Sequence, residues 1–252
     1  MSASTPTLVL RVHGDSLGLP RFHDGVSVHQ TYAELFAEVL RGRGWDVRLY
    51  NRSIGGGSIR DIGDQLASDT TYFGDREAGV LVLQSGIVDC APRPIPHSVR
   101  TVIEHAPAPV RTRVVRFLHD HRAHILGAGI VFRRTPPAQF ERRFASTLEA
   151  AKRSARAVFV MNIAPTTPEM DAHSPGLSAS IERYNELIAR VASGAGTEVV
   201  HIDVHRAITD RSIEECVNPH DGHHITPAGH ALYAELLAAG SLGLLPPPIS
   251  TR

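Results

Sequence analysis

A serine, a histidine and an aspartate that could share one catalytic site lie in two short motifs near opposite ends of the sequence. The first motif is Gly-Asp-Ser-Leu at residues 14–17, and the second is Asp-Gly-His-His at residues 221–224. A serine hydroxyl is a weak nucleophile at neutral pH unless an imidazole accepts its proton and an acid orients that imidazole. These residue types predict that Ser16 attacks a substrate, His224 accepts its proton and Asp221 orients His224.

The position of each motif supports this assignment. Ser16 follows an apolar run and a glycine, the pattern of a nucleophile at a tight turn after a strand, although a serine that caps a helix has the same pattern. Asp221 precedes His224 by three residues, so its carboxylate can reach back to the ring Nδ1–H and leave Nε2 for Ser16. Thr226 and Pro227 then start a helix. Because the sequence has 15 histidines, a polar loop with a chance Asp and His is the alternative.

Residues 14–18 also match the G-x-S-x-G pattern of α/β-hydrolases. Those enzymes carry the serine in mid-chain and separate the acid from the histidine widely in sequence. Here the serine follows the first predicted strand and the acid and histidine are neighbours, so we exclude that fold.

Five short apolar runs bounded by turn residues predict β-strands. They are Thr7–Val12, Trp45–Tyr50, Gly79–Gln84, Ala157–Ile163 and Glu198–Asp203. Apolar residues at helical spacing predict helices at Tyr32–Arg43, Ala138–Arg156, Ser178–Ala192 and Pro227–Ala239. Strands that alternate with helices indicate a parallel sheet covered on both faces, a three-layer α/β/α sandwich, with sites at the carboxyl ends of the strands.

Residues 90–137 interrupt this alternation with prolines and many basic residues, and only a helix around Val110–Ile125 is indicated there. We expect one domain over residues 1–252, with an insertion or lid at about 91–137. The segment either shapes the site or is a surface excursion without a functional part.

The composition is that of a soluble globular enzyme, with 42% hydrophobic and 21% charged residues and a formal net charge of zero. A neutral chain without a long apolar stretch gives no reason to expect a nucleic-acid or membrane partner. Residues 1–6 lack the pattern of a secretory signal, and Cys90 and Cys216 are too few for a disulfide framework. We therefore expect a cytoplasmic protein in which Cys90 is a buried, inert thiol. The oligomeric state has no signature in the sequence.

The two motifs and their order resemble the SGNH, or GDSL, hydrolase superfamily, over nearly the whole chain from about residue 8 to residue 237. The resemblance implies a five-stranded parallel sheet of order 2-1-3-4-5. It also implies that Ser16 is the nucleophile and that Asp221 and His224 form the D-x-x-H block.

The resemblance further implies an oxyanion hole that uses the N–H of Ser16 and the N–H of a glycine after the second strand. Glycine suits this role because the backbone must approach the substrate closely. Residues 51–58 supply such a segment, and spacing from Asn51 favours Gly56, with Gly55 and Gly57 as alternatives.

The third block departs from the family pattern G-x-N-D, in which the asparagine side chain donates to the oxyanion. Gly86 and Asp89 match, but Val88 occupies the asparagine position and cannot donate a hydrogen bond. Losing one such donor costs on the order of a hundredfold in rate. Three explanations stay open: a hole made of two N–H groups, a substitute donor such as Arg93 or another residue of 90–137, or a chain that is no longer a fast hydrolase.

The substrate is expected to lie beside Asp15, Gly86, Val88, Asp89 and Arg93. We expect Asp89 to brace its loop through backbone hydrogen bonds. Arg93 either forms an ion pair with Asp89 or binds an anionic group, because guanidinium matches carboxylate and phosphate. An anionic or sugar-containing acyl ester is indicated by the arginines of residues 93–134, which are Arg93, Arg100, Arg111, Arg113, Arg116, Arg122, Arg133 and Arg134.

A zinc site is the competing interpretation of the histidines. His201, Asp203 and His205 alternate along the last predicted strand and could act as ligands together with His220 or His223. Because the serine triad accounts for the same neighbourhood, no metal and no other cofactor are expected.

The predicted function is serine-dependent hydrolysis of a small-molecule carboxylic ester through an acyl-enzyme on Ser16. The alternative is an acyltransferase with the same triad, which a closed lid at residues 90–137 would favour because it would exclude water. A third interpretation is a non-catalytic ligand-binding protein, which Val88 favours and the intact triad opposes.

Overall fold

The sheet of this protein is fully parallel. The computed structural model describes residues 6–69, 71, 76 and 79–248. Five strands pair in the order β2-β1-β3-β4-β5, which confirms the predicted topology. The strands are β1 (Thr7–His13), β2 (Asp46–Asn51), β3 (Gly79–Gln84), β4 (Ala157–Met161) and β5 (Val199–Ile202). Each boundary lies within one or two residues of the predicted one.

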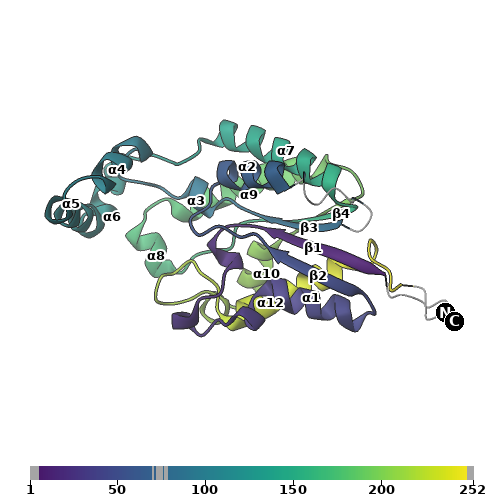
Figure 1. Cartoon of the computed structure of the whole chain (residues 1–252). Helices are drawn as coiled ribbons and strands as arrows, with labels where there is room; N and C mark the ends of the chain where they lie inside the picture. Colours follow the sequence, from purple (N-terminus) through teal and green to yellow (C-terminus); the bar gives the residue numbers. More distant parts are fainter. Residues whose placement is uncertain (1–5, 70, 72–75, 77–78, 249–252) are drawn as a thin grey trace.

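Helices cover both faces of the sheet and complete the three-layer sandwich (Figure 1). One layer holds α1 (Tyr32–Gly42), α10 (Val204–Arg211), α11 (Ile213–Cys216) and α12 (Pro227–Ser241). The other layer holds α2 (Ile59–Asp69), α7 (Pro137–Ser154) and α9 (Leu177–Ser193). All four helices predicted between the strands are present, whereas α2 was not predicted.

The core lies on both faces of the central strands, because side chains alternate across a strand. Val80 and Val82 of β3 belong to the apolar cluster on the α1 and α12 side. Leu81 and Leu83 belong to the second cluster, on the α2, α7 and α9 side. A strand that is buried on both faces gives the continuous apolar run from which β3 was predicted.

The carboxyl ends of neighbouring strands lie at one edge of the sheet. The last registered pairs are Val12 with Asn51, His13 with Leu83, Gln84 with Met161, and Met161 with Ile202. The segments that follow the strands therefore emerge side by side, which brings the two motifs from opposite ends of the sequence together.

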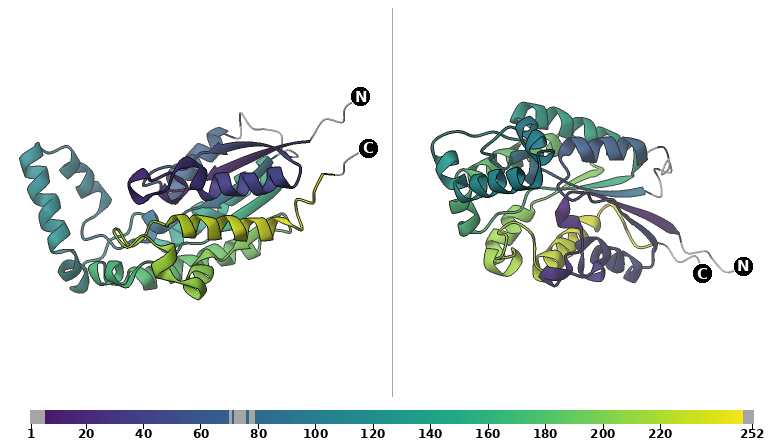
Figure 2. Two further views of the ribbon diagram at one scale, coloured as in Figure 1. Left: turned by 90° about the horizontal axis from the view of Figure 1, so that it is seen from below. Right: turned by 60° about the vertical axis from the view of Figure 1, so that its left-hand side comes forward.

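Residues 93–132, called the arm from here on, project from the body of the molecule (Figures 1 and 2). The arm holds α4 (His97–Glu104), α5 (Ala108–Asp120) and α6 (Arg122–Gly127), so the helix predicted at Val110–Ile125 is two helices. Its base is closed by an antiparallel bridge in which the N–H groups of Arg93 and Phe132 donate to each other's carbonyl at 2.8 and 2.9 Å. The role of the wider segment 91–137 as an insertion stays a prediction.

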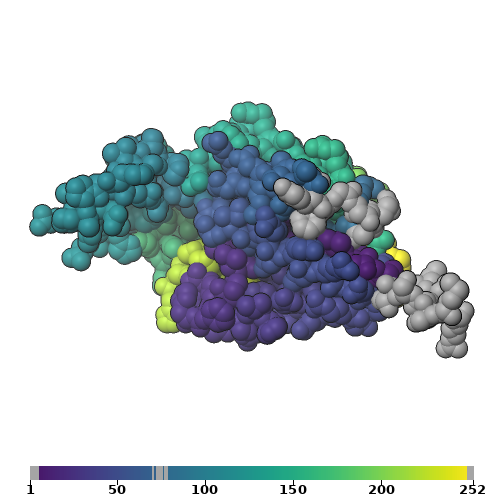
Figure 3. Space-filling view, in the orientation of Figure 1, coloured from purple at the N-terminus to yellow at the C-terminus, as the bar shows by residue number. Residues whose placement is uncertain are grey.

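The space-filling view shows the arm standing off the body as a separate lobe (Figure 3). Within the described chain, α4 and α5 have no buried side chain. Among those same residues, no helix is both long enough and apolar enough to cross a membrane. The cytoplasmic location stays a prediction.

Candidate active site

The turn that carries Ser16 is held by its buried neighbour Asp15. The Oδ1 atom of Asp15 accepts from the Leu17 N–H at 3.0 Å. Gln84, the last residue of β3, donates its side-chain amide to Oδ2 at 3.1 Å and accepts from the Asp15 N–H at 3.2 Å. Burial raises the pKa of Asp15 to about 6, although the hydrogen bonds from Leu17 and Gln84 oppose this shift.

Asp15 was expected beside the substrate, and the structure corrects this expectation. Its side chain is fully buried, and both carboxylate oxygens accept internal hydrogen bonds. Asp15 therefore positions the serine turn. Its partner Gln84 was not predicted, and its only signal in the sequence is a polar residue at the end of an otherwise apolar strand.

Ser16, His224 and Asp221 form one hydrogen-bonded line. The distance from Ser16 Oγ to His224 Nε2 is 2.9 Å, and the distance from His224 Nδ1 to Asp221 Oδ2 is 2.8 Å. The other oxygen of Asp221 accepts from the backbone N–H groups of His223 and His224 at 3.2 and 3.0 Å. The loop itself thus orients the carboxylate toward its own histidine.

The charge of Asp221 determines which ring nitrogen of His224 carries the proton. Burial raises the pKa of Asp221, but hydrogen bonds from the ring and the backbone N–H of His224 outweigh burial and hold it well below its usual range. An ionised carboxylate can only accept, so Nδ1 carries the proton and the Nε2 lone pair faces Ser16. This is the tautomer that a general base requires.

The loop that carries the D-x-x-H motif needs a glycine at residue 222. Gly222 has a φ of +71°, and a Cβ atom there would lie 2.5 Å from the Met170 Cβ and 2.8 Å from the Thr167 Oγ1. Thr167 also donates its N–H to the Gly222 carbonyl at 3.0 Å. Helix α12 begins after this loop with Thr226 as N-cap and Pro227 in the first turn, as predicted.

Arg21 is a charged neighbour of the triad that was not predicted from the sequence. Its Nη2 donates to Asp221 Oδ2 at 2.9 Å, and its Nη1 lies 3.1 Å from His224 Nε2. Its Nε donates to Asp24. Because a guanidinium only donates, Nη1 shares the Nε2 lone pair with the Ser16 hydroxyl. Residues 17–31 contain no recognisable motif, so only the fold brings Arg21 to the site.

The expected oxyanion donors are available. Within the described residues, neither the Ser16 N–H nor the Gly56 N–H has a protein acceptor. Gly57 donates its N–H to the Ile54 carbonyl at 2.9 Å, which removes it as a candidate donor. Gly56 has a φ of +67°, a conformation that favours glycine, whereas a side chain there would meet no neighbouring atom. Backbone conformation, not space, therefore accounts for this glycine.

The glycine segment is tied to the serine turn. The Ile54 N–H donates to the Gly14 carbonyl at 2.8 Å. The Asn51 side chain donates to the Gly18 carbonyl at 2.6 Å. These bonds fix the first two blocks relative to each other, so the two candidate donors belong to one rigid unit.

The third block forms the short helix α3 (Ile87–Cys90), which Gly86 precedes. Val88 is partly buried against the apolar cluster on the α2 side of the sheet and has no side-chain donor. Asp89 is fully buried, and its oxygens accept from the Ile59 N–H at 2.9 Å and the Thr135 hydroxyl at 2.5 Å. Asp89 thus braces this loop, as expected, and is not exposed to a substrate.

Replacing Asp89 with asparagine is expected to change the pH dependence of stability. Burial raises the pKa of Asp89 to about 6, although bonds from Thr135 and Ile59 oppose this. An acid whose pKa is higher in the folded state stabilises the fold below the unfolded pKa of about 4, and this contribution is lost as pH rises through 6. An asparagine oxygen can accept from the Ile59 N–H while its amide donates to the Thr135 hydroxyl. Because asparagine does not ionise, the variant does not lose stability as pH rises through 6.

Urea unfolding at pH 4.5 and 7.5 measures this effect. As pH rises from 4.5 to 7.5, we expect the free energy of unfolding of Asp89→Asn to increase by about 1–2 kcal/mol relative to that of wild type. Asp61 is the matched control, because hydrogen bonds and Arg134 lower its pKa despite some burial. Asp61→Asn should lose stability relative to wild type at pH 7.5. The prediction is contradicted if the difference in unfolding free energy between Asp89→Asn and wild type is the same at pH 4.5 and at pH 7.5.

Arg93 does not form the alternative ion pair with Asp89. Its Nη2 donates to the Val88 carbonyl at 3.0 Å, and no described carboxylate lies within ion-pair distance of it. Cys90 is fully buried, and burial raises the pKa of its thiol well above the usual range. Burial and a raised pKa are the properties of an unreactive thiol, so the expectation that Cys90 is inert stays a prediction.

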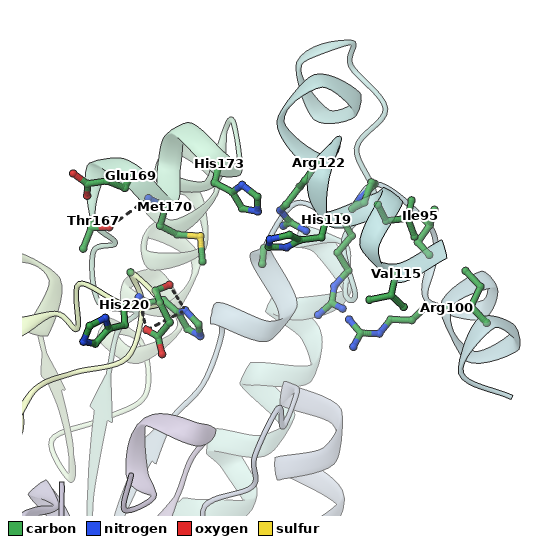
Figure 4. Close-up of a pocket in the computed structure, with 18 of the residues that line it drawn as sticks. Ile95, Arg100, Val115, His119, Arg122, Thr167, Glu169, Met170, His173 and His220 are labelled. Carbon is green, nitrogen blue, oxygen red and sulfur yellow. Dashed lines mark hydrogen bonds and ion pairs between the residues drawn. The ribbon is translucent and has the colours of Figure 1, made fainter. Parts of the chain in front are cut away.

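A cavity of about 720 Å³ lies between the arm and the body, next to the triad loop. Asp221, Gly222 and His223 line it on the body side, and Arg93 and Arg122 line it on the arm side. Figure 4 shows His119 and Arg122 facing His173 and Met170. The rings of His119 and His173 lie 4.9 Å apart and join the two sides.

The contacts of the triad loop are less compatible with a metal site than with a serine triad. Asp221, His223 and His224 have ligand atoms within 4.8 Å of one another. Asp221 and His224 are already bonded to each other, and the Arg21 guanidinium lies beside them, which opposes a cation there. Of the residues that the structure describes, His201, Asp203 and His205 form no ligand group, because β5 ends at Ile202 and Asp203 caps α10.

The sheet order, the serine turn after β1 and the D-x-x-H loop before α12 are those of the SGNH class of hydrolases. The GDSL-like Lipase/Acylhydrolase family model matches residues 12–232. The chain therefore belongs to this family, whose members are lipase- or esterase-type acyl hydrolases.

Solved structures with the same fold cover nearly the whole chain. The lipase/acylhydrolase from Enterococcus faecalis has a TM-score of 0.66 and 15% identity, over 96% of this chain and 99% of that one. A putative GDSL-like lipase from Parabacteroides merdae has a TM-score of 0.60 and 14% identity, over 97% and 100%. The esterase EstA from a Pseudoalteromonas species has a TM-score of 0.57 and 10% identity, over 94% and 98%. Comparison with curated proteins gives no match.

Proposed function

We propose that this protein hydrolyses carboxylic esters through an acyl-enzyme on Ser16. The observation that carries the proposal is the line from Asp221 through His224 to Ser16, with heavy-atom distances of 2.8 and 2.9 Å. A hydroxyl within hydrogen-bond reach of an oriented imidazole is an activated nucleophile. Membership of a family of acyl hydrolases supports the same chemistry.

The reaction follows from the protonation states of the three side chains. Ser16 Oγ attacks the ester carbonyl while its proton passes to His224 Nε2. The resulting imidazolium donates this proton to the leaving alcohol, and the acyl group stays on Ser16. Water then attacks the acyl-enzyme, again with His224 as base, and releases the acid and the free serine. Asp221 keeps the ring oriented and stabilises the imidazolium.

The oxyanion hole in this proposal consists of two backbone donors, the N–H groups of Ser16 and Gly56. Both lack an acceptor among the described residues, so each is free to donate to the charge that develops on the carbonyl oxygen. Val88 adds no third donor. We therefore expect a hydrolase slower than one with an asparagine at this position, by about a hundredfold.

Hydrolysis is favoured over acyl transfer because the arm stands off the body as a separate lobe (Figures 1 and 3) and Ser16 is only partly buried. Water can then reach the acyl-enzyme. Adding a primary alcohol to the assay distinguishes the two reactions. A hydrolase releases mainly the free acid, whereas a transferase converts most of the acyl group into the new ester.

Intact mass after incubation with a fluorophosphonate tests the activated serine. We expect one adduct on the wild type and none on Ser16→Ala or His224→Ala. A phosphonate inhibits the structurally similar esterase EstA, which supports this choice of reagent. A wild type that forms no adduct would overturn the proposal and favour the interpretation as a non-catalytic binding protein.

A further inference from the structure

Two arginines in the cavity wall have no carboxylate partner among the residues that the structure describes. Arg93 donates to the Val88 carbonyl, and Arg122 donates to the Pro92 carbonyl and to Ser174 Oγ at 2.9 Å. All these acceptors are neutral, and no described carboxylate lies within ion-pair distance of either guanidinium. The Nε of Arg93 is buried and has no partner among the described residues. Both side chains are partly buried, and charges partly removed from water are normally paired, so each guanidinium has the capacity to bind a counter-ion.

Burial and neighbouring positive charges disfavour the charged forms of Arg93 and Arg122 when no anion is bound. Burial, together with repulsion from Arg100, Arg134 and Arg122, lowers the pKa of Arg93 to about 10. Burial and repulsion from Arg100 also lower the pKa of Arg122. A bound anion would favour the charged form of both groups.

The acidic residues around the cavity do not supply this anion. Glu104 pairs with Arg100 at 2.9 Å. Asp221 is bonded to His224 and Arg21. Glu169 lies in the first turn of α8 (Pro168–His173), on the body side of the cavity. The arginine pair of the arm therefore remains free to bind an external anion.

The same cavity also offers an apolar surface. Ile95, Ile103, Val115 and Leu118 line it on the arm side, and Met170 lines it on the body side. A hydrocarbon chain placed there would leave water, which is favourable because apolar surface is removed from contact with water. The cavity thus combines apolar walls, a cationic pair and an edge formed by the triad loop.

We propose that this cavity binds an ester that carries an anionic group, with the apolar walls around its hydrocarbon part and Arg93 and Arg122 around the anion. The proposal rests on the proposed function and adds the class of substrate to it. Planar guanidinium groups bind carboxylate and phosphate alike through paired N–H donors. The anionic group belongs to the acyl part or to the alcohol part of the ester, and matched substrates separate these cases.

The test compares two pairs of esters that differ in one charge. In the first pair, the p-nitrophenyl monoester of suberic acid carries a carboxylate in its acyl part, and p-nitrophenyl 8-hydroxyoctanoate is its neutral match. In the second pair, 4-octanoyloxybenzoate carries the carboxylate in the alcohol part, and its methyl ester is neutral. We expect the wild type to prefer the anionic member of one pair by at least about tenfold in kcat/KM.

The variants Arg93→Gln and Arg122→Gln are each expected to reduce this preference about tenfold, mainly through KM. Arg116→Gln is the matched control, because it removes the same charge from the arm at a residue outside the cavity. It should keep the preference within about twofold, because an exposed charge outside the cavity wall is screened by solvent. The proposal would be overturned if the wild type shows no preference for the anionic ester in either pair. It would also be overturned if all three variants lose the preference equally.

A binding measurement keeps this test separate from the test of catalysis. Calorimetric titration of the Ser16→Ala protein with suberate needs no turnover. We expect saturable binding that weakens about tenfold when Arg93→Gln is added. Absence of binding overturns the anion site, whereas absence of fluorophosphonate labelling with binding intact overturns only the proposed chemistry. Thermal unfolding of each variant shows whether the fold is retained.

Discussion

Replacing Ser16 with alanine is expected to lower kcat for p-nitrophenyl octanoate by at least about 10⁴-fold. The substitution removes the attacking oxygen, and the residual rate comes from the oxyanion donors and substrate binding alone. The fold should be unaffected, because the only side-chain hydrogen bond of Ser16 among the described residues is the one to His224. Initial rates at saturating substrate, with thermal unfolding measured in parallel, check both statements.

Ser53 provides the matched control for this variant. It lies in the glycine segment beside the serine turn, and its hydroxyl donates to Asn51 Oδ1 at 2.7 Å. Ser53→Ala should keep kcat within about tenfold of the wild type, because the side-chain interactions that it removes, with Asn51 and Tyr32, do not involve the triad. If Ser16→Ala retains more than a tenth of the wild-type activity, the nucleophile has been assigned wrongly.

Replacing Asp221 with asparagine is expected to lower kcat by about 10³–10⁴-fold. The backbone N–H groups of His223 and His224 require an acceptor at the position of Oδ1. The amide NH₂ must then face His224, whose Nδ1 has to accept and whose Nε2 has to carry the proton. In that tautomer Nε2 cannot take the proton of Ser16. The same kcat assay measures the loss.

Asp24→Asn separates this effect from a general loss of charge around Arg21. Asp24 and Asp221 both accept from the Arg21 guanidinium, but only Asp221 contacts His224. We expect Asp24→Asn to lower kcat less than about tenfold, because the tautomer of His224 is unchanged. Similar losses in the two variants would show that the position of Arg21, rather than the tautomer, limits the rate.

The fold was largely predictable because its central strands β3 and β4 are buried on both faces. Such strands have uninterrupted apolar runs, and the helices that cover them repeat apolar residues at helical spacing. Helix α2 was missed because its core contacts come mainly from Ile59, Ile62 and Leu66, separated by polar residues. The helices of the arm were harder still, because α4 and α5 bury no side chain within the described chain.

The residues of the candidate site were predictable where a motif sets their local geometry. They were not predictable where tertiary contacts determine their position. The three-residue spacing of Asp221 and His224 is sufficient for their hydrogen bond. In contrast, Arg21 reaches the triad across about two hundred positions of sequence. Asp15 was expected beside the substrate because it adjoins Ser16, but its burial depends on Gln84 of a neighbouring strand. Residue type alone does not reveal such burial.

The bridge between Arg93 and Phe132 has a consequence for how this enzyme can diversify. A segment whose two ends meet can be shortened, extended or exchanged without moving the elements on either side. The triad lies entirely outside that segment, whereas Arg93 and Arg122 of the proposed anion site lie within it. Under the two proposals, the residues for reactivity and the residues for selectivity therefore lie on separate stretches of the chain. Grafting other sequences between residues 92 and 133 is a direct route to esterases with new preferences and an unchanged nucleophile.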